Sequence, residues 1–186
     1  MTNINSSNNS YASQRGLGVF FLIGYMGSGK THWGKIWAAA NQLSFVDLDE
    51  VIEKKAGKTI AGIFEISGED HFRKIEAEAL RTCVDLQNTI VSCGGGTPCF
   101  YENMQWMNDH GITIYIACTS PEILQRVLSE KEKRPLLKKL NQAELLFFIE
   151  QKVKERLPFY SQAKVTVQSN LLTEKSFPGI ISTITP

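Results

Sequence analysis

Short apolar runs alternate along the chain with longer segments in which apolar residues recur at helical spacing. The apolar runs predict five β-strands, at residues 19–23, 44–48, 89–93, 112–117 and 164–168. Val19–Ile23 is apolar throughout, as is typical of a strand buried on both faces. Regular alternation of strands with helices predicts a parallel sheet covered by helices on both sides. We therefore expect an α/β fold.

The segments between the strands carry helical patterns. In residues 31–42, Trp33, Ile36, Trp37 and Ala40 follow the i, i+3, i+4, i+7 spacing of a helix that packs on a core. Residues 50–56 and 59–83 predict two further helices, the second interrupted at Ser67-Gly68. This is more helix than a crossover between neighbouring strands needs. Residues 49–83 are therefore expected to form an inserted substrate-binding region.

Composition limits the class of protein. The 186 residues predict one domain over 16–186, preceded by an Asn/Ser-rich segment, 1–15, that has no signal-peptide pattern and is expected to be disordered. A net charge of +1 argues against a nucleic-acid surface, and no apolar run has the ~20 residues that cross a membrane. The four cysteines form no C-x-x-C pair, which favours reduced thiols in a cytoplasmic protein. Nothing in the pattern requires a large obligate interface, so we expect a monomer.

The segment Gly24-Tyr-Met-Gly27-Ser28-Gly29-Lys30-Thr31 reads G-x-x-x-x-G-K-T and joins the first predicted strand to the first predicted helix. This is the context of a phosphate-binding P-loop, in which glycines let backbone N–H groups converge on phosphate oxygens. The following helix adds a partial positive charge at its N-terminus. Lys30 is expected to contact the β- and γ-phosphates, and the Thr31 hydroxyl to bind Mg²⁺. The sequence thus predicts binding of a nucleoside triphosphate.

Two carboxylates, Asp47 and Asp49, stand at the end of the second predicted strand. At i, i+2 on a strand they would point to the same side, toward the crevice where ligands of doubly wound sheets gather. Asp49 has a structural alternative as the N-cap of the next helix. For Asp47 we favour a functional role, because a P-loop implies Mg²⁺.

Three further features stand near the expected ligand end of the sheet. Gly94-Gly95-Gly96 directly follows the third strand and would let a small molecule approach the backbone closely. The charged, proline-containing segment at residues 129–140 is either a solvated linker or a lid over the triphosphate. Arg134 in this segment is either a surface residue or a finger that stabilises the transferring phosphoryl group.

Two other arginines also have structural interpretations. Asn141 and Glu144 predict a capped helix whose apolar face also carries Arg156, so this arginine needs an anionic partner. That partner is either a structural carboxylate or a substrate carboxylate. Arg73 could simply pair with Glu76 at i, i+3 on a solvated helix face.

Taken together, six motifs in order resemble those of the shikimate kinases. They are G-x-x-G-x-G-K-[ST] at 24–31, D-x-D at 47–49, G-E-x-x-F-R-x-x-E at 68–76, G-G-G at 94–96, R-P-L-L at 134–137 and R-x-P-x-Y at 156–160. The resemblance implies a five-stranded parallel sheet of order 2-3-1-4-5, with a substrate-binding insertion at about 49–83 and a lid at about 129–140. It also implies transfer of the γ-phosphoryl group of ATP to the 3-hydroxyl of shikimate, a step in chorismate and aromatic amino-acid synthesis.

The same resemblance implies roles for single residues. The ATP-binding set would be Gly27, Ser28, Gly29, Lys30, Thr31, His32 and Arg134. Thr31 would bind Mg²⁺ directly and Asp47 through water. The shikimate-binding set would be Asp49, Arg73, Gly94, Gly95, Gly96 and Arg156. Lys30, Asp49 and Arg134 would act in catalysis, the first and last by neutralising charge.

Two alternatives remain at this point. Another small-molecule P-loop kinase, acting on gluconate or a nucleoside monophosphate, would also have a P-loop, a lid and arginines, but is not expected to combine D-x-D, F-R-x-x-E and G-G-G at these positions. A catalytically silent relative serving as a binding module should have lost a charged residue of the site. All six of the charged residues that the motifs require are present: Lys30, Asp47, Asp49, Arg73, Arg134 and Arg156.

Overall fold

The computed structural model describes residues 18–128 and 140–184. The N-terminal segment 1–15, nearly all of the expected lid and Arg134 lie outside this part of the chain. Five strands form one parallel sheet of order β2-β3-β1-β4-β5, as predicted. The strands are β1 (Val19–Ile23), β2 (Ser44–Asp47), β3 (Thr89–Ser92), β4 (Gly111–Ala117) and β5 (Val165–Gln168).

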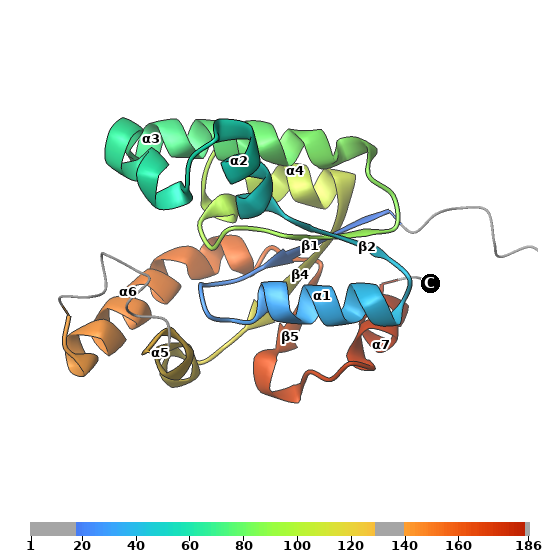
Figure 1. The fold of residues 1–186 in the computed structure, drawn as a ribbon. Helices are drawn as coiled ribbons and strands as arrows, with labels where there is room; N and C mark the ends of the chain where they lie inside the picture. Colours follow the sequence, from blue (N-terminus) through green and yellow to red (C-terminus); the bar gives the residue numbers. More distant parts are fainter. Residues whose placement is uncertain (1–17, 129–139, 185–186) are drawn as a thin grey trace, which may run out of the picture.

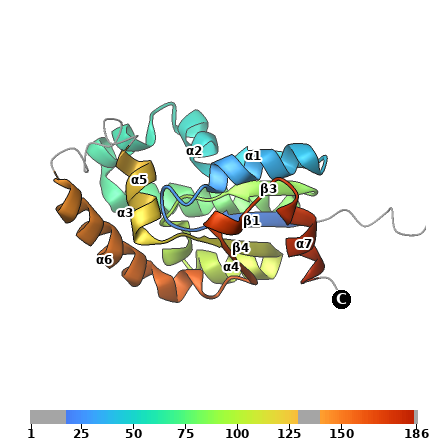
Figure 2. The same cartoon turned by 90° about the horizontal axis from the view of Figure 1, so that it is seen from below.

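Helices connect the strands and cover both faces of the sheet. They are α1 (Lys30–Ala40), α2 (Leu48–Ala56), α3 (Ile60–Arg81), α4 (Asn103–His110), α5 (Ser120–Leu128), α6 (Gln142–Tyr160) and α7 (Ser176–Ser182). The 3₁₀ turns are η1 (Thr82–Asp85), η2 (Thr97–Cys99) and η5 (Ser169–Leu171). In Figure 1, α3 and α4 lie on one side of the strands and α1 and α7 on the other. Figure 2 shows α5 beside α6 at one end of the sheet, where the two helices pack together.

The core consists of two clusters, one on each face of the sheet. Successive residues of β1 point to opposite faces: Phe21 joins the cluster beneath α2, α3, α4, α5 and α6, whereas Phe20 joins the cluster with Trp37 of α1 and Phe177 of α7. All five residues of β1 are buried, which explains why this strand is apolar throughout. No helix in residues 18–128 and 140–184 has the length and hydropathy of a membrane span.

The predicted helix features are confirmed with small shifts at the ends. α3 bends at Gly68, whose φ of 77° and ψ of 175° are not helical, so the interruption expected at Ser67-Gly68 is present. Asn141 and Glu144 form the predicted capping box at the start of α6, because each side chain accepts a hydrogen bond from the other residue's backbone N–H. β2, however, ends at Asp47 rather than at residue 48.

Candidate active site

The P-loop connects the carboxyl end of β1 to the start of α1. Gly27 and Gly29 have φ angles of 76° and 97°, a region that side-chain-bearing residues rarely adopt. Gly29 is the N-cap of α1, so this helix begins directly at the end of the loop. Ser28 is fully buried, its backbone N–H donates to Tyr25 O at 3.1 Å, and its hydroxyl has no hydrogen-bond partner in the described part of the chain.

Lys30 is buried at the bottom of the loop. Its ammonium group donates to Gly24 O at 2.8 Å and to Tyr25 O at 3.0 Å. These two carbonyls compensate for the desolvation of the charge. The cation is therefore held at the loop by backbone oxygens.

Asp47 and Asp49 do not sit on one strand, which corrects the geometry expected from their spacing. Asp47 ends β2 and is the N-cap of α2, since its Oδ1 accepts a hydrogen bond from the backbone N–H of Asp49 at 3.1 Å. The structural alternative for Asp49, a helix N-cap, is thus wrong, because the cap of α2 is Asp47. Asp49 lies in the first turn of α2, and the turn of the helix still brings both side chains to one cavity.

The environment of Asp49 favours its neutral form. Burial, which contributes most, and the negative charges of Asp47 and Glu76 together raise the pKa of this carboxyl from 3.8 to about 6, although Lys30 opposes the shift. At neutral pH the Asp49 carboxyl remains mostly ionised, yet its pKa lies close enough to neutral pH for the group to accept a proton.

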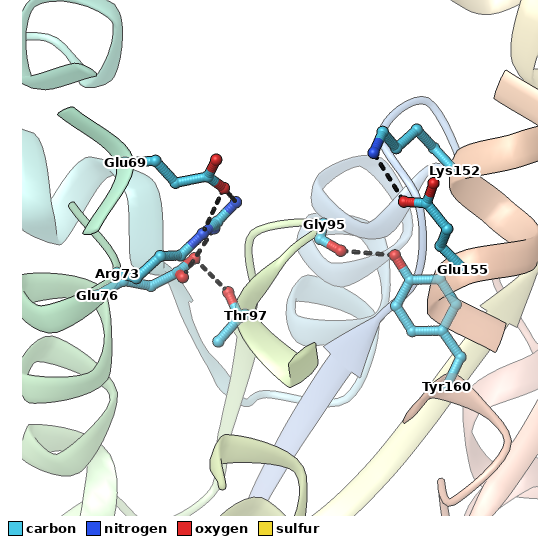
Figure 3. Close-up of polar contacts among 8 residues, drawn as sticks. All are labelled: Glu69, Arg73, Glu76, Gly95, Thr97, Lys152, Glu155 and Tyr160. Atoms are coloured by element: carbon cyan, nitrogen blue, oxygen red, sulfur yellow. Dashed lines mark hydrogen bonds and ion pairs between the residues drawn. The ribbon is translucent and has the colours of Figure 1, made fainter. Parts of the chain in front are cut away.

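Arg73 does pair with Glu76, but not on a solvated helix face. Only 9% of the Arg73 side chain and none of the Glu76 side chain is exposed, so the structural alternative of a pair on a solvated face is wrong. The guanidinium donates to Glu76 Oε2 at 3.0 Å and to Glu69 Oε1 at 2.9 and 3.1 Å. Figure 3 shows this cluster, in which Glu76 also accepts a hydrogen bond from the Thr97 hydroxyl at 2.6 Å. The helix faces inward here because Phe72 packs into the core.

The triple glycine passes between this cluster and the P-loop. A Cβ at Gly96 would lie 2.6 Å from the Arg73 guanidinium, and one at Gly94 would lie 2.7 Å from Glu76 Oε1. A side chain at either position would displace these charged groups, so glycine lets the backbone lie directly against them.

Arg156 is placed on the opposite side of the cavity by α6. Its guanidinium lies over the Tyr25 ring, 5.3 Å from the centroid, and is half-buried. Within residues 18–128 and 140–184, no carboxylate lies at ion-pair distance from it. The structural carboxylate considered as its partner is therefore not found among the residues described.

One cavity of about 630 Å³ brings most of the predicted site together. The predicted residues that line it are Gly27, Gly29, Lys30, Thr31, His32, Asp47, Asp49, Arg73, Gly94, Gly95, Gly96 and Arg156. Ser28 does not line it, and Arg134 lies outside the described residues.

Among the lining residues that did not emerge as site residues from the sequence, three have a charged or hydroxyl side chain. Glu76 belongs to the F-R-x-x-E motif, but only its pairing with Arg73 was expected. The Ser92 hydroxyl lies 3.1 Å from Thr31 Oγ1, and its position at the end of a buried strand was the available signal. Arg126 of α5 reaches the P-loop, donating to Gly27 O at 3.0 Å, and its spacing along the chain offered no signal for this contact.

Comparison with known proteins shows the family to which this site belongs. The family model described as shikimate kinase matches residues 26–185. The shikimate kinases of Phocaeicola vulgatus and Parabacteroides distasonis are 42% and 40% identical to the chain, over 83% and 86% of its length and 89% and 93% of theirs.

Solved structures agree with this relationship. The crystal structure of shikimate kinase from Bacteroides thetaiotaomicron has a TM-score of 0.81 at 35% identity and covers 90% of this chain and 96% of its own. Shikimate kinase from Acinetobacter baumannii in complex with shikimate has a TM-score of 0.78 at 31% identity and covers 90% and 92%. With a P-loop, a buried arginine cluster and a triple glycine around one cavity, the chain belongs to the shikimate kinase family.

Proposed function

We propose a division of roles among the cavity residues for the reaction of this family. As a shikimate kinase, the chain is an ATP-dependent phosphotransferase that converts shikimate to shikimate 3-phosphate, with release of ADP. The observation that carries the assignment of roles is that Lys30, Asp49, Arg73 and Arg156 line one cavity. A nucleotide phosphate and a carboxylate-bearing acceptor can thus be held side by side.

The P-loop holds the triphosphate. The backbone around Gly27, Ser28 and Gly29, together with the N-terminus of α1, faces the phosphates, and His32 borders the same space. Lys30 exchanges its carbonyl partners for β- and γ-phosphate oxygens and stabilises the charge that develops during transfer. By resemblance to the family, we propose that Arg134 adds a second positive charge from the segment at 129–140.

The residues beside Lys30 suit a Mg²⁺ ion that accompanies ATP. The Thr31 hydroxyl donates to Asp47 Oδ2 at 2.9 Å and lies 3.1 Å from the Ser92 hydroxyl, so hard oxygen ligands converge at the P-loop. Thr31 is proposed to bind the ion directly and Asp47 through water. The bound ion neutralises charge on the β- and γ-phosphates and fixes their orientation.

Asp49 is proposed to orient the 3-hydroxyl of shikimate and to accept its proton. Its raised pKa suits a group that must be ionised before transfer and protonated after it. A loose transition state depends mainly on positioning and charge neutralisation, so orientation is the larger part of this role.

The two arginines are proposed to bind the carboxylate of the acceptor from opposite sides, with Gly94, Gly95 and Gly96 between them. Arg73 is already paired with two carboxylates, whereas none lies near Arg156 in the described residues. Arg156 therefore brings the larger uncompensated positive charge, and its planar fork matches a carboxylate. Arg73 serves chiefly as an oriented hydrogen-bond donor.

We also propose that the protein is a cytoplasmic monomer. The four cysteines are all free thiols, as expected in a reducing compartment. Size-exclusion chromatography with light scattering at micromolar concentration tests the oligomeric state, and a dimer mass would contradict it.

The function is tested by measuring ADP release from Mg·ATP with shikimate, gluconate, nucleoside monophosphates or no acceptor. We expect release that depends strictly on shikimate. Release with another acceptor alone would show that the pocket serves a different substrate. Binding of ATP without release for any acceptor would indicate a silent binding module.

A further inference from the structure

Tyr160 connects α6 to the triple-glycine loop across 65 positions of sequence. Its hydroxyl donates a hydrogen bond to Gly95 O at 2.5 Å, as Figure 3 shows. The side chain is fully buried, although it is the last residue of its helix. The position of this hydroxyl is therefore determined by packing within the protein and not by contact with solvent.

The ring of Tyr160 is held by a second tyrosine. It stacks on Tyr115 of β4 with centroids 5.0 Å apart and an interplanar angle of 28°. This stack leaves the hydroxyl little freedom, so the entropy of ordering it has already been lost on folding. Tyr160 thus provides a rigid polar group beside the cavity.

Arg156 lies one helical turn before Tyr160. Burial lowers the pKa of Arg156, but its interactions with Tyr160, Tyr25 and Cys99 together outweigh burial and raise the pKa above the ordinary value, Tyr160 contributing most of the three. The Tyr160 hydroxyl donates its hydrogen to Gly95 O. Only the lone pairs of its oxygen are therefore available to the Arg156 guanidinium.

A neutral partner orients Arg156 without neutralising it. Arg73, in contrast, is held by Glu69 and Glu76, whose charges reduce its attraction for an anion. A Cβ on Gly95 would lie 3.4 Å from Arg156 Nη1, so the glycine loop and the guanidinium are close neighbours. One hydroxyl can therefore fix two groups of the acceptor site relative to each other.

We propose that Tyr160 is a positioning residue that aligns Arg156 and Gly95 for the carboxylate of the acceptor. It acts on the affinity for shikimate and not on phosphoryl transfer. This inference rests on the proposed function, because it takes Arg156 as the carboxylate-binding group.

The test is Tyr160→Phe, which retains the stacked ring and removes only the hydroxyl. We expect the KM and the calorimetric Kd for shikimate to rise about tenfold, because the hydrogen bond that holds Gly95 beside Arg156 is lost. The KM for ATP and kcat should stay within about twofold of the parent protein, since no contact to the triphosphate changes. Tyr115→Phe is the matched control, because it removes a hydroxyl from the same stack, one ring away from Arg156.

Two comparisons separate positioning from a general loss of structure. In an Arg156→Ala background, Tyr160→Phe should weaken shikimate binding no further, because the group it aligns is gone. The methyl ester of shikimate, which lacks the carboxylate charge, should bind equally weakly to the parent and to Tyr160→Phe. Melting temperatures of all variants are measured alongside.

An unchanged Kd for shikimate in Tyr160→Phe would overturn the proposal, as would equal weakening in Tyr115→Phe. These outcomes are distinct from failure of the proposed function. If that function is wrong, the unmodified protein itself releases no ADP with shikimate. If only the role of Tyr160 is wrong, the unmodified protein is active and the two tyrosine variants bind shikimate with the same affinity as each other.

Discussion

The Thr31 hydroxyl donates a hydrogen bond to Asp47 Oδ2 at 2.9 Å, joining the first turn of α1 to the end of β2. The other oxygen of the same carboxylate caps α2. Asp47 therefore has two separable roles: it shapes the backbone that carries Asp49, and it supplies a charged oxygen beside the P-loop.

Asp47→Asn should separate these roles. Asparagine caps helices as well as aspartate, so the melting temperature should change little. The loss of the charge should raise the Mg²⁺ concentration needed for half-maximal ADP release by on the order of tenfold. Titration of Mg²⁺ at fixed ATP measures this. Asp47→Ala, which removes the cap as well, should also lose about 1 kcal/mol of unfolding free energy.

Lys30→Ala should lower kcat by roughly 10²- to 10³-fold, because it removes a charge that stabilises the transferring phosphoryl group. Steady-state ADP release measures kcat, and circular dichroism checks that the fold is kept. Lys35→Ala is the control on the same helix, since Lys35 is exposed and its contacts lie on the surface, a 3.8 Å pair with Glu50 and an ammonium 5.6 Å from the centroid of the Phe45 ring. Equal turnover in the two variants would contradict the role of Lys30.

Arg73→Ala and Arg156→Ala should differ in their effect on stability. Removing Arg73 leaves the buried Glu76 carboxylate without its cation, which should cost about 3 kcal/mol of unfolding free energy. Removing Arg156 leaves no carboxylate without its cation within the described residues, so the unfolding free energy of Arg156→Ala should remain near that of the parent. Urea unfolding measures both.

Arg156→Ala should raise the KM for shikimate by the equivalent of roughly 2–5 kcal/mol of binding free energy, because a buried charge contact to the acceptor is lost. The KM for ATP should change little. The measurement is steady-state kinetics with each substrate varied in turn. A rise in the KM for ATP alone would show that Arg156 does not bind the acceptor.

The raised pKa of Asp49 predicts an acid limb in the activity profile. Activity should fall as the pH drops through about 6, because the protonated carboxyl can no longer accept the proton of the 3-hydroxyl. The kcat/KM for shikimate, measured between pH 5 and pH 8, tests this. In the residual activity of Asp49→Asn this limb should be absent.

The same group should reduce stability at neutral pH. Its folded pKa of about 6 lies above the unfolded value of 3.8, so the ionised form is disfavoured in the folded state. The cost is fully present above pH 6 and is relieved as the pH falls toward 4. Asp49→Asn should therefore raise the unfolding free energy at pH 7 by on the order of 2 kcal/mol, with no such gain at pH 4. Thermal or urea unfolding at the two pH values decides it.

Features encoded by neighbouring residues were predictable from the sequence. The order of strands and helices, the bend at Gly68 and the capping box of Asn141 and Glu144 each follow from a local pattern. The P-loop was predictable for the same reason, because its glycines and Lys30 belong to one contiguous motif. The sheet order came from resemblance to a family rather than from periodicity, since local patterns do not say which strands are neighbours.

Features that depend on packing were misjudged or missed. Spacing placed Asp49 on a strand, although the chain turns into α2 at Leu48. Arg73 pairs with Glu76 as its spacing suggested, but only the packing of α3 decides that this pair faces inward. Arg126 reaches Gly27 O across 99 positions, a contact with no signature in the sequence around either residue.

The sequence by itself determined the elements, the phosphate-binding loop and the family, because these are expressed in contiguous motifs and in the period of burial along the chain. Tertiary structure alone decided the electrostatic state of the site: which arginine is neutralised, which carboxyl has a raised pKa and which hydroxyl aligns a cation. These properties arise from desolvation and from distances between segments far apart in sequence, such as Tyr160 and Gly95. They exist only once the helices have packed on the sheet.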